Sequence, residues 1–170
     1  ELGQNYGYVL YRSTLTRGKE ILSCKIRGGM DRAVIFADGK QVDIRNDYEM
    51  DQKTGFTLEN DNGSLDILME NMGRVNYGPE IELQKKGITH GVLINGTFHM
   101  GWDMYSLPLD NISNVDYTRG YEEGLPAFYK FTFLADEVGD TFLDVSGFGK
   151  GCAFVNGRNI GRFWEAGPQK

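Results

Sequence analysis

Few side chains in this sequence have the types and spacing that catalysis or metal binding requires. The 24 acidic residues could in principle supply a pair of carboxylates for acid and base chemistry, but such a pair must be held at a fixed distance on a rigid frame. The two histidines, His90 and His99, and the two cysteines, Cys24 and Cys152, form no cluster with metal-ligand spacing. We therefore assign no catalytic residue, no metal site and no cofactor.

Aromatic and sulfur-containing side chains have simpler structural interpretations. Trp102 and Trp164 could stack on the C–H faces of sugars, but a lone tryptophan in a β-rich chain is more often part of a core or a domain interface. Phe163 and Trp164 are neighbours, so on a regular strand they point to opposite faces. Cys24 and Cys152 both lie in apolar runs, which is typical of buried thiols, and a disulfide between them stays open.

Composition excludes several classes of partner. Of the 170 residues, 40% are hydrophobic, which is enough for a packed core. The formal net charge is −6 and no cluster of Lys and Arg is present, so we expect neither nucleic acid nor an anionic membrane surface as a partner. The N-terminal stretch ELGQNYGYVLYRS has no basic region followed by an apolar run, so no signal peptide is visible and the compartment is not assigned.

Turn signals beside short apolar runs predict an all-β chain. Asp-Gly and Asn-Gly pairs tolerate the positive φ angles that a tight hairpin needs. They lie next to strand-like runs such as AVIFA and GVLI, and no amphipathic segment of three helical turns is present. The pairs are Asp38-Gly39, Asn62-Gly63, Asn95-Gly96 and Asn156-Gly157. This spacing is typical of a β-sandwich or barrel.

Two similar segments within the sequence suggest two related modules. Residues 28–40 read GGMDRAVIFADGK and residues 146–158 read SGFGKGCAFVNGR, with glycine, basic and apolar residues and the turn in the same order. The first copy continues into further strand-like sequence, whereas the second has only RNIGRFWEAGPQK after its turn. We interpret this as two β-sandwich modules, the second lacking one or more closing strands and exposing an edge at which a second copy could pair.

We divide the chain accordingly into three parts. The first β-sandwich is expected over residues 1–110, and the second, partial one over residues 126–170. Residues 111–125 (NISNVDYTRGYEEGL) are polar and contain glycine, which is typical of a connector.

Two long segments carry a resemblance to a known family. The stretch ILMENMGRVNYG (67–78) resembles the signature of the first small β-domain in glycoside hydrolase family 35 β-galactosidases, and GKGCAFVNGRNIGRFWEAGPQ (149–169) resembles that of the second. NYGYVLYRS and QKKGITHGVLING fit the same family in the same order. The resemblance implies a galactose-binding-domain-like jelly-roll β-sandwich over residues 1–110 and an incomplete second module.

The resemblance also implies a role in a larger enzyme. In the family a catalytic (β/α)8 barrel precedes these domains, and two glutamates on it perform retaining hydrolysis of terminal β-linked galactose, which requires carboxyl groups about 5–5.5 Å apart. This sequence has no repeated strand–helix pattern to build such a barrel. We therefore expect an inactive, accessory portion of a β-galactosidase, whose partner is the barrel of the same parent chain and whose galactoside substrate binds in that parent.

One substrate-binding residue follows from the resemblance. A tyrosine of the NMGRVNYG motif walls the galactose pocket in the family, and here that position is Tyr77. Asn76 and Arg74 are expected to support the loop, Arg74 through a pair with Glu70. The alternative from the residues alone is that Tyr77 caps the core of its own domain and that Arg74 pairs locally.

Two alternative functions stay open from sequence. The chain could be a free-standing carbohydrate-binding module, because galactose-binding-like sandwiches often bind sugars, although fold alone is only an analogy for function. It could also be an interaction or folding module without a ligand.

Overall fold

The computed structural model describes residues 2–16 and 18–167, which form two compact units. The first unit comprises the residues up to 109 together with 122–126, and the second comprises 110–121 and the residues from 127 onward. The domain boundaries expected from the sequence stay a prediction. None of the helices within the described ranges is long and apolar enough to cross a membrane.

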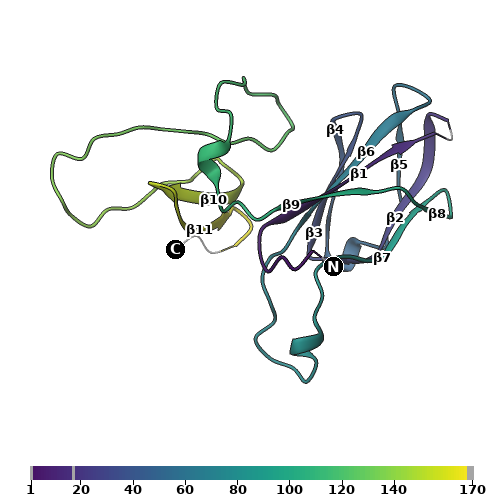
Figure 1. Ribbon diagram of the computed structural model, residues 1–170, viewed down its shortest axis with the longest axis horizontal. Coiled ribbons are helices and arrows are strands. Elements are labelled where there is room, and N and C mark those ends of the chain that lie inside the picture. Colours follow the sequence, from purple (N-terminus) through teal and green to yellow (C-terminus); the bar gives the residue numbers. More distant parts are fainter. Residues whose placement is uncertain (1, 17, 168–170) are drawn as a thin grey trace. The chain divides into compact units, whose positions relative to one another are not determined.

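Strands account for nearly all of the regular structure (Figure 1). In the first unit they are β1 (Tyr8–Leu15), β2 (Glu20–Met30), β3 (Arg32–Ala37), β4 (Lys40–Asn46), β5 (Thr54–Thr57), β6 (Gly63–Glu70), β7 (Gly87–Ile94), β8 (Thr97–His99) and β9 (Asp103–Leu107). The second unit contains β10 (Lys150–Val155) and β11 (Arg158–Trp164). The described residues also form three short 3-10 helices, namely η1 (Asp47–Glu49), η2 (Ile81–Leu83) and η3 (Ile112–Asn114).

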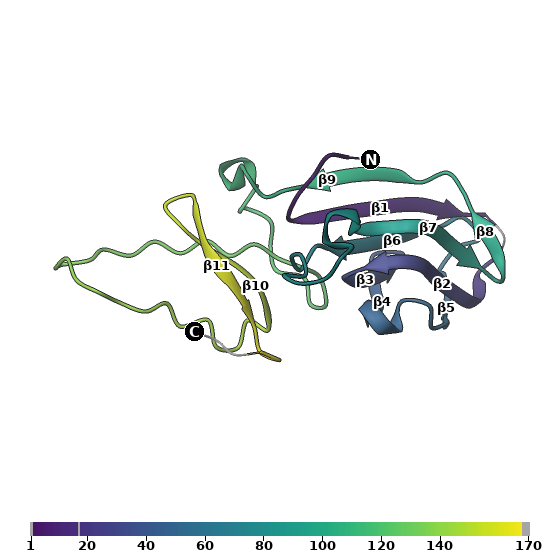
Figure 2. The same ribbon diagram turned by 90° about the horizontal axis from the view of Figure 1, so that it is seen from below.

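Two antiparallel sheets form the first unit. One has the order β4-β3-β6-β1-β9, which Figure 2 shows from β4 at the bottom to β9 at the top, and the other has the order β5-β2-β7-β8. Alternate residues of β6 point inward, namely Leu65, Ile67 and Met69, and they meet residues of β2 and β7 from the facing sheet in one buried cluster. The all-β fold class predicted from the sequence is confirmed.

Three of the four predicted turn pairs form tight hairpins. Asp38 and Gly39 join β3 to β4 with φ angles of 48° and 77°, which is the paired positive φ that a two-residue hairpin needs. The pairs Asn95-Gly96 and Asn156-Gly157 have the same geometry. Gly63 differs because it is buried at the start of β6, where a Cβ would lie 2.8 Å from Oδ1 of Asp38. That position requires glycine because of a close approach rather than a turn.

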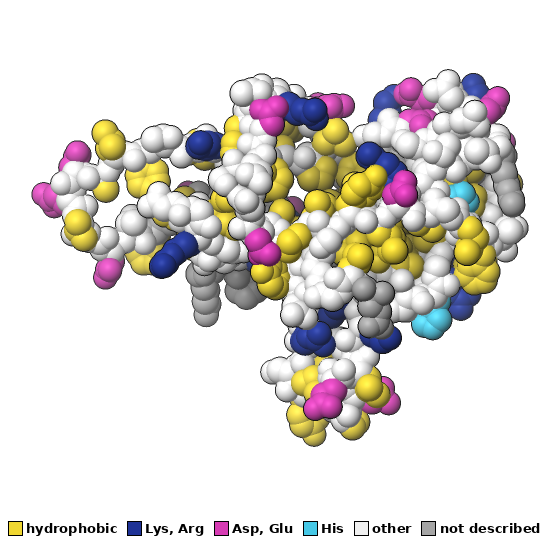
Figure 3. Space-filling view, in the orientation of Figure 1, with side chains coloured by type: hydrophobic (Ala, Val, Ile, Leu, Met, Phe, Trp, Pro, Cys, Tyr) yellow, Lys and Arg dark blue, Asp and Glu magenta, His cyan; other side chains and the backbone are white. Residues whose placement is uncertain are grey.

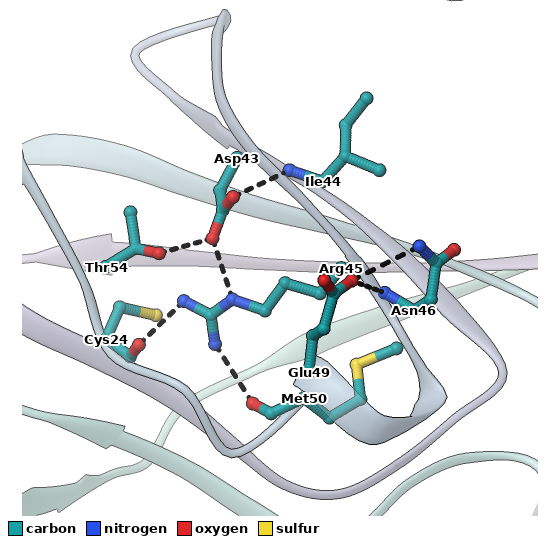
Figure 4. Close-up of polar contacts among 8 residues, drawn as sticks. All are labelled: Cys24, Asp43, Ile44, Arg45, Asn46, Glu49, Met50 and Thr54. Atoms are coloured by element: carbon teal, nitrogen blue, oxygen red, sulfur yellow. Dashed lines mark hydrogen bonds and ion pairs between the residues drawn. The ribbon is translucent and has the colours of Figure 1, made fainter.

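A buried arginine connects the two sheets at one edge of the sandwich (Figure 4). Arg45 lies on β4 and is only 2% exposed. Its guanidinium donates to the carboxylate of Asp43 at 2.7 Å, to the carbonyl of Cys24 on β2 at 2.8 Å and to the carbonyl of Met50 at 3.0 Å. Asp43 also accepts a hydrogen bond from the hydroxyl of Thr54 on β5. The guanidinium therefore compensates its own burial by hydrogen bonds that span both sheets.

The second unit contains one two-stranded sheet among its described residues. β10 and β11 pair antiparallel, with an irregularity between Ala153 and Phe154. Phe163 lies against Phe148 at 6.4 Å between ring centroids, whereas Trp164 lies under Nζ of Lys150 at 5.1 Å. Residues 127–149 have no regular strand and carry several exposed apolar side chains, namely Phe131, Phe133, Leu134, Val138 and Phe142.

We expect Arg45→Met to destabilise the first unit by about 3–5 kcal/mol, because it leaves the Asp43 carboxylate and two buried carbonyls without their donor. The free energy of unfolding can be measured by urea titration. Arg27→Met is the matched control, since the ion pair of Arg27 with Asp51 is exposed and its loss should cost less than about 1 kcal/mol. Equal losses of stability in the two variants would contradict the bridging role of Arg45.

We also expect acidic pH to reduce the contribution of Asp43 to the free energy of unfolding. Burial raises the pKa of Asp43, but hydrogen bonds from Thr54 and Arg45 outweigh it, and the pKa of Asp43 is lowered overall. The unfolded chain then binds the proton more readily, so the contribution of Asp43 is present above a pH of about 4 and is lost as pH falls through the folded-state pKa. Urea titrations from pH 7 to pH 2 should show the advantage of the wild type over Asp43→Asn shrinking below that pH. A difference that stays constant would contradict this role.

Candidate functional site

The longest connection in the first unit, residues 71–86 between β6 and β7, carries the residues that the sequence singles out. In Figure 1 this segment, with η2 in it, extends away from the sandwich. Tyr77 is 91% exposed near its far end. Gly73 and Gly78 bracket the motif with φ angles of 110° and 133°, a conformation that residues with a Cβ rarely adopt. The loop therefore presents Tyr77 to solvent and keeps it out of the core of its own unit.

The base of the loop is held by hydrogen bonds. The backbone N–H of Asn71 donates to the carbonyl of Gly7 at 3.1 Å, and its side-chain amide donates to the carbonyl of Asn5 at 2.9 Å. Across the loop, Arg74 donates to the carbonyl of Gln84 at 3.3 Å, and the N–H of Val75 donates to the side-chain oxygen of Gln84 at 3.2 Å. The two sides of the loop are thus joined by hydrogen bonds near its base, while its far end stays exposed.

The predicted supporting residues lie at different depths. Glu70 ends β6 and is buried, with Oε2 3.8 Å from Nη1 of Arg32. Arg74 is exposed and contacts Gln84, and Asn76 lies on the exposed part of the loop next to Tyr77. A pair between Glu70 and Arg74 therefore stays a prediction, as do the supporting role of Asn76 and the substrate contact of Tyr77.

Three further residues hold the loop and were not singled out by the sequence. Gln84 receives the contacts of Arg74 and Val75. Asp31, between β2 and β3, accepts a hydrogen bond from the N–H of Met72 at 2.7 Å and pairs with Nζ of Lys86 at 2.6 Å. Asp31 is 55 residues from Lys86, and no local pattern in the sequence indicates such a contact.

The exposed side chains of this loop are mostly apolar. Exposed apolar side chains gather on it, with basic groups near its base (Figure 3). The apolar residues are Met72, Val75, Tyr77 and Leu83. A tyrosine presents a ring face for sugar C–H groups and a hydroxyl for a sugar hydroxyl. Within the ranges 2–16 and 18–167, no group of three or more His, Cys, Asp or Glu side chains could hold a metal ion.

The two tryptophans already have contacts within their own units. Trp102 packs against the core of the first unit, and its indole N–H donates to the carbonyl of His99 at 3.1 Å. Trp164 has the ammonium group of Lys150 over its ring. Both rings therefore take part in packing, which leaves Tyr77 as the more accessible surface for stacking.

Two segments of the sequence match models of known protein families. Residues 1–108 match the model of the first all-β domain of β-galactosidase, and residues 126–170 match the model of its galactose-binding domain. The galactose-binding model thus covers the second segment, although the likeness to that fold was expected for residues 1–110.

Similar proteins include Beta-galactosidase 1 of Dictyostelium discoideum, 34% identical over 100% of this chain and 28% of that protein. The Beta-galactosidase of Xanthomonas manihotis is 32% identical over 99% of this chain and 28% of that protein. The mouse Beta-galactosidase is 34% identical over 100% of this chain and 30% of that protein. The chain therefore spans less than a third of the length of these curated relatives.

We expect Tyr77→Ala to change the free energy of unfolding of this chain by less than about 0.5 kcal/mol, because an exposed loop side chain contributes little to packing. Ile35→Ala is the contrast, since Ile35 is fully buried in β3 and its truncation should cost about 2–5 kcal/mol. Urea titration of both variants measures the difference. A loss above about 1 kcal/mol for Tyr77→Ala would mean that the ring serves its own unit.

Proposed function

The chain belongs to the β-galactosidase family, and we propose that it forms the non-catalytic accessory domains of a longer enzyme, in which Tyr77 contributes to the rim of the galactose pocket. The enzyme is a family 35 glycoside hydrolase that cleaves terminal β-linked galactose with retention of configuration. Its catalytic (β/α)8 barrel supplies the two glutamates, and the chain described here supports that barrel.

One observation carries the proposal, namely the exposure of Tyr77 on a loop whose base is fixed. An aromatic side chain in water forgoes the stabilisation that burial would give it. The ordered base of the loop, held through Asn71 and Gln84, restricts the positions that this ring can take. Such an arrangement suits a side chain that completes a site on another surface, where a preorganised contact avoids part of the entropy cost of binding.

The acidic residues of the first unit support an accessory rather than a catalytic role. Two partly buried carboxylates on the strands are engaged with cations, Asp66 with Arg12 at 2.7 Å and Asp43 with Arg45 at 2.7 Å. Retaining hydrolysis needs two carboxyl groups about 5–5.5 Å apart facing one sugar, one of them free to attack. Both carboxylates are thus occupied by structural contacts, Asp66 between β6 and β1 and Asp43 within β4.

The second unit offers surfaces for association in the same enzyme. Its exposed apolar side chains over residues 127–148 suit contact with a protein partner. We assign the barrel as that partner, with pairing of two copies at the edge of the β10–β11 sheet as a further proposal.

Direct sugar binding is the second candidate function. It is favoured by the match of residues 126–170 to a model described as a galactose-binding domain. The packing of Trp102 against the core and of Lys150 over Trp164 argues against it, because a stacking platform needs an open ring face. The accessory role therefore remains the better supported of the two.

The test is Tyr77→Phe in the full-length enzyme, assayed with a β-galactoside. Loss of one neutral hydrogen bond should raise KM about threefold to tenfold with little change in kcat, because the contact exists equally in the ground state and the transition state. Tyr77→Ala should raise KM further, since it also removes the ring. Tyr48→Phe is the matched control, because Tyr48 is also highly exposed but lies on η1. Unchanged kinetics in both Tyr77 variants would rule out the pocket contact.

A further inference from the structure

We propose that Asp31 is the positioning residue of the 71–86 loop, and that its single carboxylate fixes where Tyr77 meets the substrate by holding both ends of the loop at once. The substrate part of this inference rests on the proposed function, whereas the anchoring part does not.

The two oxygens of Asp31 serve different ends of the loop. Oδ2 accepts the backbone N–H of Met72 at 2.7 Å, just after β6 ends. Oδ1 lies 2.6 Å from Nζ of Lys86, the last residue before β7 begins. Met72 and Lys86 are 14 residues apart (86 − 72) and meet through one side chain. The carboxylate thus fixes the width of the loop at its base.

The backbone of Asp31 is itself held in place by its neighbouring strands. It is the one residue between β2 and β3, which belong to different sheets. Its neighbours are paired on both sides, Met30 with Gly87 of β7 and Arg32 with Glu70 of β6, and its own N–H donates to the carbonyl of Glu70 at 3.1 Å. The strands that lead into and out of the loop therefore hold the backbone of Asp31, and its side chain holds the loop in return.

Burial distinguishes the pair of Asp31 and Lys86 from the ion pairs on the surface. The side chains of Lys86 and Asp31 are only 12% and 16% exposed, against 52% and 59% for Arg27 and Asp51. A largely buried ion pair cannot lose one partner without leaving the other charge poorly solvated. The contacts of Arg74 and Val75 with Gln84 across the loop are longer, at 3.3 and 3.2 Å. Asp31 therefore joins the two ends of the loop through shorter and more buried contacts than Gln84 does.

If the base of the loop is less restrained, a smaller fraction of molecules holds Tyr77 in the position that binds substrate. Tyr77 lies five residues beyond Met72, so its position follows that of the loop base. If only a fraction of molecules present Tyr77 correctly, apparent affinity falls by that fraction, while the chemistry on the barrel continues unchanged. The signature of a positioning role is thus a raised KM with a preserved kcat.

The anchoring is tested in this chain by amide hydrogen exchange. Asp31→Asn keeps an oxygen for Met72 but removes the charge that Lys86 needs, and Lys86→Met removes the other partner. Both variants should exchange the amides of residues 73–85 about tenfold faster, with β2 and β6 unchanged. Asp51→Asn is the matched control, because it makes the same substitution in an exposed pair. If Asp31→Asn fails to fold, Lys86→Met carries the test, and unchanged loop exchange in the folded variants overturns the inference.

The substrate part is tested in the full-length enzyme by a double-mutant cycle. Asp31→Asn should raise KM about tenfold and change kcat less than twofold, and the effect should largely vanish in a Tyr77→Ala background, because the two residues act through one contact. Additive effects would overturn the positioning role. Faster loop exchange in the Asp31 and Lys86 variants, together with unchanged KM in Tyr77→Phe and Tyr77→Ala, would instead refute the proposed function. Asp31 would then anchor the loop only, so the two failures are distinguishable.

Discussion

A buried guanidinium at the edge of the sandwich is the constraint on which the rest of the first unit depends. Arg45 ties β4 in one sheet to Cys24 on β2 in the other, and also holds the carbonyl of Met50. That same carbonyl accepts the N–H of Ile26, and Sδ of Met50 lies 3.0 Å from where a Cβ on Gly29 would be. The contacts therefore lead from Arg45 through Met50 to the end of β2, directly before Asp31. A site residue can be held precisely only where its supporting strands are held first.

Stability and recognition are assigned to different residues in this unit. The core packs the two sheets against each other, and the ion pairs of Arg12 and Arg32 join strands within the five-stranded sheet. Tyr77 contributes almost nothing to that packing, because it is 91% exposed. Asp31 belongs to both groups, since it lies within the fold and acts on the loop. This separation is typical of sites in which a rigid scaffold carries a recognition loop.

The second unit is less complete in its described residues than the first. It pairs only β10 with β11, and its exposed aromatic side chains alternate along a segment without regular strands. The cluster of Tyr129, Phe131 and Phe148 still brings rings into contact beside Phe163, so that a small apolar centre exists. Two strands alone bury little surface, which accounts for the many apolar side chains that this unit leaves exposed.

Local chemistry determined what the sequence predicted correctly. The Asp38-Gly39, Asn95-Gly96 and Asn156-Gly157 hairpins follow from residues that tolerate positive φ, and the all-β class follows from short apolar runs between such turns. The matches to both β-galactosidase models cover the two segments that resembled that family. Only the tertiary structure revealed the contacts of Arg45, the close packing of Gly63 against Asp38 and the position of Asp31 at the base of the loop. These depend on strand register and on pairing between residues far apart in the chain, which no local pattern of side chains encodes.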